Sequence, residues 1–296
     1  MMWNWLVSSL GVGATVILYD GSPFYPNGYT LLAMAKKLGI TIFGTSAKYI
    51  TSLEATGIKP KTISSFPKLR TILSTGSPLS EENYDFIYAH WKKDVQLSSI
   101  SGGTDLISCF ALGTPILPVK RGELQCRGLG MKVESFDEKG KSLFECKGEL
   151  VCTQAFPSMP LYFWNDNDNS KYDAAYFETF PGIWHHGDYI KINSQGGVEI
   201  FGRSDTTLNP GGVRIGTAEI YQVVERFPEI EDSLVIGQPW RNDERIILFV
   251  IMKENVQLTD VLIQKIERYI RATYMPGFEP PYTIINNTKI YFGREN

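Results

Sequence analysis

The sequence is poor in the residues that build metal sites, disulfide frameworks and surfaces for anionic polymers. It has three histidines and four cysteines among 296 residues, and no two cysteines have the CxxC spacing. A disulfide framework is not expected in a chain of this length without a secretion signal, so we interpret the cysteines as reduced thiols and expect a cytosolic, cytoplasmic protein. The net charge of −3 gives no electrostatic basis for binding nucleic acid or an anionic membrane.

The sequence also lacks a long uninterrupted apolar run. Its apolar N-terminal stretch, residues 1–20, is broken by polar residues such as Asn4 and by glycines, and the first lysine is Lys36. These interruptions argue against a transmembrane helix, and the missing basic flank argues against a signal peptide. We therefore predict no stable membrane insertion. The stretch is interpreted as a short helix and then a buried strand over residues 14–18, so that the chain starts inside a domain.

The adjacent histidines, His185 and His186, also argue against a shared metal site. Neighbouring residues of an extended segment point to opposite faces, so the two rings should not reach one ion. The third histidine, His90, is far away in the sequence.

What is present indicates a mixed fold of two domains, since 296 residues with 43% apolar content exceed one typical domain. Residues 29–106 alternate between helix-like and strand-like segments, which indicates a parallel sheet covered by helices. The predicted helices are 31–38, 47–55 and 80–91, and the predicted strands are 40–43, 69–73 and 95–100.

After Gly122 the pattern changes to short strand-like runs, which predict a small β-rich layer. Residues 156–189 are aromatic-rich and read as irregular, and residues 190–201 read as a hairpin. A second unit follows, with helices over 219–227 and 259–274 and strands over 233–236 and 246–252. We predict an α/β fold, in which a large domain over 1–204 combines a helix-covered sheet with the β-rich layer. A smaller α+β domain spans 205–296.

Two glycine-containing turns follow predicted strands of the parallel sheet: STGSPL over 74–79 and SISGGTD over 99–105. Ligands of such sheets gather beyond the carboxyl ends of the strands, so the turns would form two walls of one pocket. Gly102 and Gly103 permit close backbone approach, Thr104 offers a hydroxyl, and Asp105 offers a carboxylate for a metal or a polar group. A plain glycine-rich turn explains the same residues without a ligand.

Two later motifs carry further charge. In WHHGDYI, over 184–190, Asp188 can accept both hydroxyls of a ribose, although a Gly-Asp turn is the structural alternative. The stretch GRSDTTLNPGGVRIGTAE, over 202–219, combines Arg203, Asp205 and Arg214 with four glycines. It suits a bending segment that contacts an anionic ligand, whereas a surface ion pair is the alternative for both arginines.

The order SGGTD, HGD, GRSD and GGVRIGTAE resembles the adenylate-forming enzymes, which include the acyl-CoA synthetases. The resemblance covers nearly the whole chain and is strongest to members that activate acetoacetate. Another short-chain acyl-CoA synthetase and a non-catalytic nucleotide-binding remnant are the alternatives. The resemblance implies an AMP-forming acid–thiol ligase that uses ATP, Mg²⁺ and coenzyme A. The acid attacks the α-phosphorus of ATP, and the thiol then displaces AMP.

The resemblance also implies site roles by position. The adenine pocket would be lined by Gly76, Ser77, Pro78, Ser101, Gly102 and Gly103. Thr104 would contact the α-phosphate and Asp105 would bind Mg²⁺. Asp188 would bind the ribose, Arg203 would bind ribose or phosphate, and Arg214 would bind phosphate. Asp205 would be the hinge of a domain rotation, with glycines around it. Gly102 would widen the acid pocket where acetate-activating members carry a tryptophan, unless a turn angle alone requires this glycine.

Two departures from the family pattern matter. The family's Ser/Thr- and Gly-rich phosphate loop has no counterpart in residues 1–100. Near the C-terminus, Asn287 and Thr288 stand where a glycine before the catalytic lysine is expected, with Lys289 as the candidate remnant. Both features stabilise the transferring phosphate, so we expect a fragment that does not adenylate an acid by itself.

Overall fold

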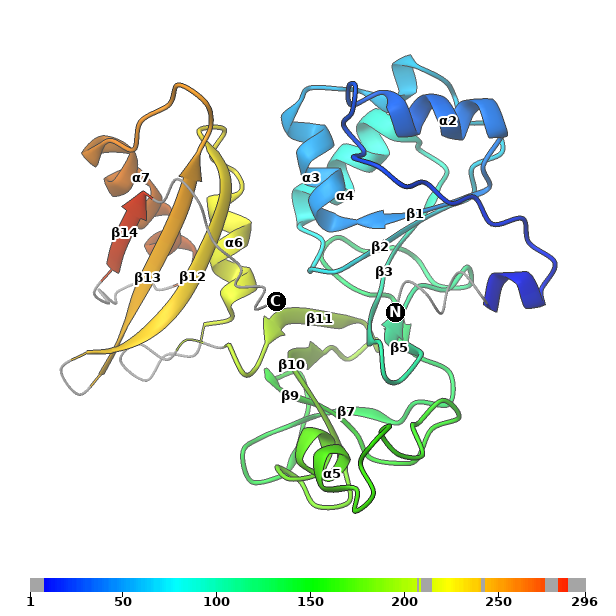
Figure 1. Cartoon of the computed structure of the whole chain (residues 1–296), viewed down its shortest axis with the longest axis vertical. Coiled ribbons are helices and arrows are strands. Elements are labelled where there is room, and N and C mark those ends of the chain that lie inside the picture. Colours follow the sequence, from blue (N-terminus) through cyan, green and yellow to red (C-terminus); the bar gives the residue numbers. More distant parts are fainter. Residues whose placement is uncertain (1–7, 207, 209–214, 241–242, 275–281, 287–296) are drawn as a thin grey trace. The chain divides into compact units, whose positions relative to one another are not determined.

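The computed structural model describes residues 8–206, 208, 215–240, 243–274 and 282–286. The chain divides into two compact units, residues 1–200 and 201–296 (Figure 1). Their boundary falls inside a strand, whereas the sequence prediction placed a domain boundary between residues 204 and 205. Arg214 and the tail around Lys289 lie outside the described residues. Within the described ranges, no helix combines the length and apolarity needed to cross a membrane.

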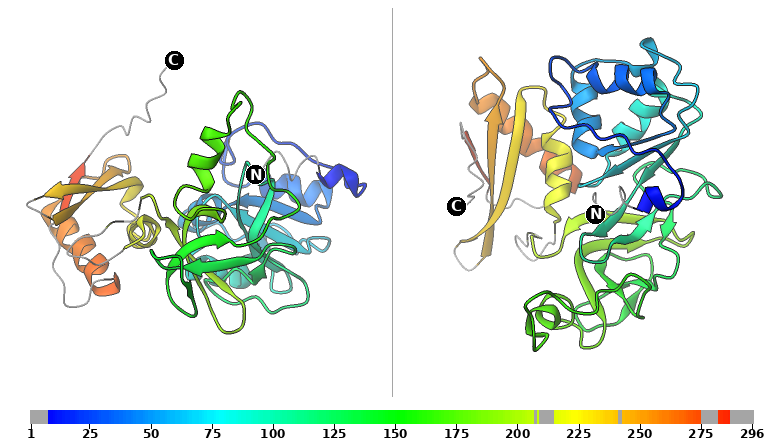
Figure 2. Two further views of the ribbon diagram at one scale, coloured as in Figure 1. Left: turned by 90° about the horizontal axis from the view of Figure 1, so that it is seen from below. Right: turned by 45° about the vertical axis from the view of Figure 1, so that its right-hand side comes forward.

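The first unit begins with a parallel sheet in the order β1-β2-β3, formed by β1 (Ile42–Ser46), β2 (Thr71–Thr75) and β3 (Gln96–Ser99). Three helices and two short helical turns accompany it: α2 (Thr30–Leu38), α3 (Ala47–Ala55), η1 (Pro60–Thr62), α4 (Glu81–Phe86) and the π-helical turn η2 (Ile87–Trp91). Apolar residues of α2, α3, α4 and η2 share one core with the sheet. Figures 1 and 2 show the ribbons of these helices beside the sheet. The alternation predicted from the sequence is therefore confirmed.

Helix α4 shows why the sequence starts a helix at this point. The Ser80 hydroxyl accepts a hydrogen bond from the Asn83 backbone N–H at 3.4 Å, and Glu81 and Glu82 occupy the first turn. Such a cap satisfies a free N–H, and acidic residues favour the positive end of the helix dipole. The cap fixes where the STGSPL turn ends and the helix begins.

The rest of the first unit is β-rich, as predicted. One antiparallel sheet has the order β4-β5-β6, with β4 (Ser101–Gly103), β5 (Ser108–Leu112) and β6 (Cys126–Arg127). A five-stranded sheet has the order β11-β10-β9-β7-β8, with β7 (Val133–Phe136), β8 (Ser142–Leu143), β9 (Gly148–Cys152), β10 (Trp184–Ile192) and β11 (Val198–Arg203). Aromatic rings fill its core, where Phe110 and Trp184 both pack edge-to-face on Phe156.

The second unit has its own core. The long strands β12 (Ile230–Trp240) and β13 (Asp243–Met252) are antiparallel, and β14 (Tyr282–Asn286) runs parallel to β13. Helices α6 (Thr217–Val224) and α7 (Asp260–Tyr274) contribute apolar residues to that core. The predicted apolar face of the last helix is confirmed, because Leu262, Ile266 and Ile270 are all buried.

Two local predictions were wrong. Residues 14–18 form no strand, and Leu18 is 72% exposed; none of the described strands pairs with this stretch, so its apolar pattern has no sheet to join. Residues 156–189 are not irregular throughout, because they contain α5 (Ser170–Tyr176) and the first six residues of β10. Ring packing among Phe163, Tyr172 and Tyr176 orders this segment, and composition alone does not reveal such contacts.

Candidate functional site

The turns that follow β2 and β3 lie next to each other, as the sequence analysis expected from neighbouring strands. The Ile100 backbone N–H donates to the Ser74 carbonyl at 2.9 Å, and the Thr75 hydroxyl donates to the Ile100 carbonyl at 3.3 Å. Gly76 has a φ of +92°, a left-handed conformation that favours glycine. The backbone therefore brings the start of STGSPL to the start of SISGGTD.

A bulge in β10 presents the HGD motif. The pairing of β10 with β9 shifts register between His185 and Tyr189, and Gly187 within the shift has a φ of +77°. Bulges re-aim side chains and are frequent beside functional sites. The local cause is therefore a glycine that permits the bulge, with a histidine and an aspartate on either side of it.

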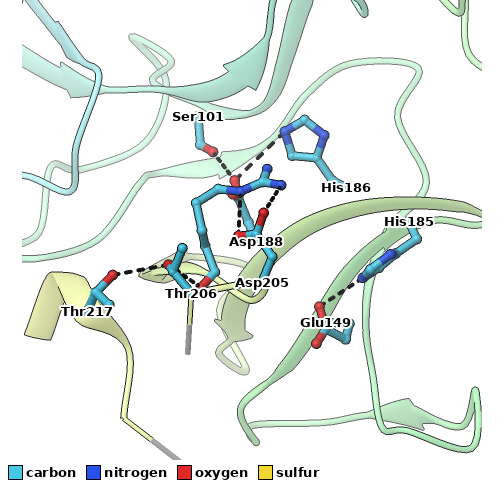
Figure 3. Close-up of polar contacts among 9 residues, drawn as sticks. Ser101, Glu149, His185, His186, Asp188, Asp205, Thr206 and Thr217 are labelled. Atoms are coloured by element: carbon cyan, nitrogen blue, oxygen red, sulfur yellow. Dashed lines mark hydrogen bonds and ion pairs between the residues drawn. The ribbon is translucent and has the colours of Figure 1, made fainter. Parts of the chain in front are cut away.

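Asp188 joins the SISGGTD and WHHGDYI motifs of the first unit. The Ser101 hydroxyl donates to Asp188 Oδ2 at 3.2 Å, across 87 residues of sequence (Figure 3). His186 Nε2 lies 3.8 Å from the same oxygen. The structure thus brings together Ser101 and Asp188, which the sequence analysis predicted for one site, and adds His186, which it did not.

His185 belongs to a different environment. Its Nε2 lies 3.0 Å from Glu149 Oε2 on the neighbouring strand β9 (Figure 3). Phe180 packs edge-to-face on its ring. The two adjacent rings therefore have separate partners, which is the arrangement expected of neighbouring residues in a strand.

Asp105 contacts a residue that the sequence analysis did not consider. The Tyr176 hydroxyl, on α5, donates a short hydrogen bond to Asp105 Oδ2, and the Tyr176 ring stacks on Trp184 at 3.6 Å. The sequence analysis did not identify Tyr176 as a site residue, because it lies in the segment predicted to be irregular. Thr104 and Asp105 are themselves exposed.

The donor set fits Mg²⁺ only in the manner of a nucleotide-bound ion. Among the residues that the structure describes, no three His, Cys, Asp or Glu side chains form a metal cluster. Mg²⁺ is commonly held by one or two carboxylates together with substrate phosphates. A single exposed carboxylate, Asp105, is consistent with that mode.

Gly102 has a structural reason that the sequence did not show. A Cβ atom at this position would lie 2.2 Å from the Ser108 carbonyl oxygen and 2.9 Å from Cys109 Cα. Its φ is not in the left-handed region, so a turn angle is not the requirement. Close approach of β5 to β4 requires glycine here, and the predicted role in an acid pocket stays a prediction beside this steric one.

In the second unit, Arg203 and Asp205 form the surface ion pair named as the structural alternative. Arg203 Nε lies 3.2 Å from Asp205 Oδ1, and Nη2 lies 3.3 Å from Oδ2; both side chains are exposed. Such a pair contributes little to stability. Thr206 anchors the loop, since its hydroxyl donates to the Arg203 carbonyl and lies 3.2 Å from the Thr217 hydroxyl (Figure 3).

Comparison with models of protein families gives no match. The acetoacetyl-coenzyme A synthetase of Rhizobium meliloti (strain 1021) is 53% identical over 280 residues, which are 95% of this chain and 43% of that protein. The acetoacetyl-CoA synthetase of Danio rerio is 51% identical over 296 residues, covering 96% of this chain and 44% of that protein. The solved acetoacetyl-CoA synthetase from Streptomyces lividans matches with a TM-score of 0.88 and 43% identity, covering 98% of this chain and 44% of that one.

These matches agree with the order of the sequence motifs and with the fold. The chain therefore belongs to the adenylate-forming acyl-CoA synthetases and, within them, to the acetoacetyl-CoA synthetase family. It spans less than half the length of the relatives it matches.

Proposed function

We propose that this chain supplies the nucleotide-binding turns and the smaller mobile domain of an acetoacetate–CoA ligase. That ligase converts acetoacetate, ATP and coenzyme A into acetoacetyl-CoA, AMP and pyrophosphate. The observation that carries the proposal is the hydrogen bond from Ser101 to Asp188, which joins SISGGTD to HGD. Two motifs that follow the family's order come within hydrogen-bond distance of each other, as a shared ligand site requires.

Each group has a chemical task in this proposal. Asp188 accepts the ribose hydroxyls, because a carboxylate can accept both at once. Gly76, Ser77 and Pro78, with the backbone of 101–103, border the adenine, and Thr104 donates its hydroxyl to the α-phosphate. Arg203 and Arg214 act on ribose or phosphate oxygens, for which the planar guanidinium is suited.

The remaining assignments concern the metal, the acid and the domain motion. Asp105 would hold Mg²⁺, which when bound neutralises charge on the transferring phosphate. Tyr176 orients that carboxylate through its hydrogen bond. Gly102 borders the acid pocket, and Asp205 is the hinge of a unit spanning residues 205–296. The protein works in the cytosol on these small molecules, in ketone-body and lipid metabolism.

The test is a chimera in which this chain replaces the matching segment of the Streptomyces lividans enzyme. We expect acetoacetate-dependent release of pyrophosphate, followed by acetoacetyl-CoA formation. Asp188→Asn should abolish most of this activity, since it removes a charged ribose acceptor. Glu149→Gln is the matched control and should retain activity, because Glu149 pairs with His185 and takes no part in the hydrogen bond between Ser101 and Asp188. A folded chimera that prefers acetate or another short-chain acid would contradict the acetoacetate assignment.

A second candidate, a non-catalytic nucleotide-binding module, is favoured by the absence of the phosphate-loop motif from residues 1–100. For the chain alone we expect AMP binding without acid-dependent exchange of pyrophosphate into ATP. Robust exchange by the purified chain would contradict this second candidate and our expectation of an incomplete catalytic site.

A further inference from the structure

His186 is enclosed in a way that fixes its ring. The residue is only 9% exposed, and the Phe110 ring packs edge-to-face against it with centroids 4.8 Å apart. A Cβ atom on Gly103 would lie 3.0 Å from His186 Cε1. Because Gly103 has no left-handed φ, the glycine is explained by the space it leaves for the imidazole rather than by a turn.

The ring is aimed at the carboxylate of the candidate ribose site. Its Nε2 lies 3.8 Å from Asp188 Oδ2, the oxygen that also accepts the Ser101 hydroxyl at 3.2 Å (Figure 3). The three groups come from β4 and from the bulge of β10. Ser101 on β4 and His186 on β10 therefore both face the same oxygen of the Asp188 carboxylate.

We propose that His186 is a positioning residue for Asp188. With Ser101, it fixes the plane of the carboxylate, so that Asp188 is preorganised to accept the hydroxyls of a ribose diol. A separation of 3.8 Å is longer than a hydrogen bond, but such contacts often tighten when ligand binds. Partners behind a ligand-binding group commonly determine its orientation and affinity. The ribose part of this inference rests on the proposed function.

The alternative is a purely structural role, in which His186 only fills space beside Phe110. A ligand-free measurement separates the two roles. Long-range ¹H–¹⁵N spectra report which ring nitrogen carries hydrogen, and the chain has only three histidines, so His90→Gln, His185→Gln and His186→Gln assign every signal. The matched control is the neighbouring ring, whose partner is Glu149.

We expect Asp188→Asn to change the ring nitrogen shifts of His186 and leave those of His185 as they are. Glu149→Gln should do the reverse. If Asp188→Asn leaves the His186 signals unchanged, the two side chains are not coupled and the positioning role is overturned.

The second measurement compares binding of AMP with binding of 2′,3′-dideoxy-AMP, which lacks the diol. In the wild-type chain we expect AMP to bind more tightly, and His186→Ala should reduce that preference about tenfold, the low end for a supporting partner. Affinity for the dideoxy nucleotide should not change. His186→Gln, which keeps a donor, should recover part of the preference, and His185→Ala should retain all of it.

The outcomes are distinguishable. A wild-type chain that binds both nucleotides equally would overturn the ribose site at Asp188, and the spectra would still decide whether His186 orients that carboxylate. An equal loss of affinity for both nucleotides in His186→Ala would indicate a packing role and would overturn positioning. If His186→Ala does not fold, Gly103→Ala tests the same idea by displacing the ring, with Gly44→Ala as its control.

Discussion

The two faces of strand β10 both carry a histidine and a charged side chain, but these side chains have different kinds of partner on each face. On one face, His185 pairs with Glu149 and Lys191 pairs with Glu199, each across to a neighbouring strand. On the other, Trp184, His186 and Asp188 turn toward Phe110, Gly103 and Ser101. The first arrangement is a ladder of ordinary cross-strand pairs. In the second, Ser101 and His186 both face the Asp188 carboxylate beside an aromatic core. This convergence of polar groups is the reason for placing the candidate site on that face.

Truncating the core side of this comparison should have the largest effect. Trp184 is 1% exposed and stacks on Tyr176, whereas Trp164 is 85% exposed. Trp184→Ala should lower the free energy of unfolding of the first unit by about 3–5 kcal/mol, because it removes contacts with several rings and leaves a cavity. Trp164→Ala should change it by less than about 0.5 kcal/mol. Amide exchange of β9 and β10 in increasing urea measures both.

If the two substitutions cost the same, the aromatic residues around Trp184 would not form a stabilising core. The platform for His186 and Asp188 would then need another explanation.

The close contact of β4 with β5 is expected to come next. Gly102→Ala places a methyl group against the backbone of Ser108, which cannot yield as a side chain would. Overpacking of this kind typically costs about 1–3 kcal/mol, and sometimes more. Gly44→Ala, in β1, is the control, because nothing lies within 4 Å of its added Cβ. Thermal unfolding of the two variants compares them directly.

A Gly102→Ala variant as stable as wild type would show that β5 can move away from β4. Only in that case would Gly102→Trp be a clean test of the acid pocket. With the strands as close as they are, a tryptophan at this position in the chimera should impair acetate and acetoacetate turnover alike, because it displaces the backbone.

Local sequence signals predicted much of the fold, and pairwise contacts account for most of what they missed. The helix over 47–55 was predicted with the observed bounds, whereas β1 and β2 begin two residues later than predicted, because an apolar run does not fix where pairing begins. The start of β10 was missed because a bulge interrupts its alternation.

The same distinction holds for the candidate site. Ser101 and Asp188 were predicted for it, each from its own motif. The sequence could not show that Tyr176 contacts Asp105, or that Phe110 and Gly103 enclose His186, because those contacts join residues far apart in the chain. It also could not show that Gly102 is required by a neighbouring backbone. The binding roles of all these residues stay predictions.

The smallest expected effect lies on the outer face of β10. Lys191 Nζ donates a hydrogen bond to Glu199 Oε1 at 2.8 Å, and this bond raises the pKa of the Lys191 ammonium. Each side chain is about one-third exposed, so solvent screens the pair, and breaking it with Glu199→Gln should cost only about 0.2–1 kcal/mol near neutral pH. A double-mutant cycle with Lys191→Met isolates the coupling from other effects of each substitution.

The pH dependence of that coupling has a definite sign. A raised lysine pKa in the folded state means that the stabilisation is fully present below the ordinary lysine value of about 10.4. It is lost as pH rises through the higher folded value, because the ammonium then gives up its charge. The coupling should also shrink in high salt, since exposed charges are screened. A coupling energy that is the same near neutral pH and above about pH 11 would show that packing, not charge, joins the two side chains. The β10 face that carries His185 and Lys191 would then be held by packing, as the Asp188 face is, and not by its ion pairs.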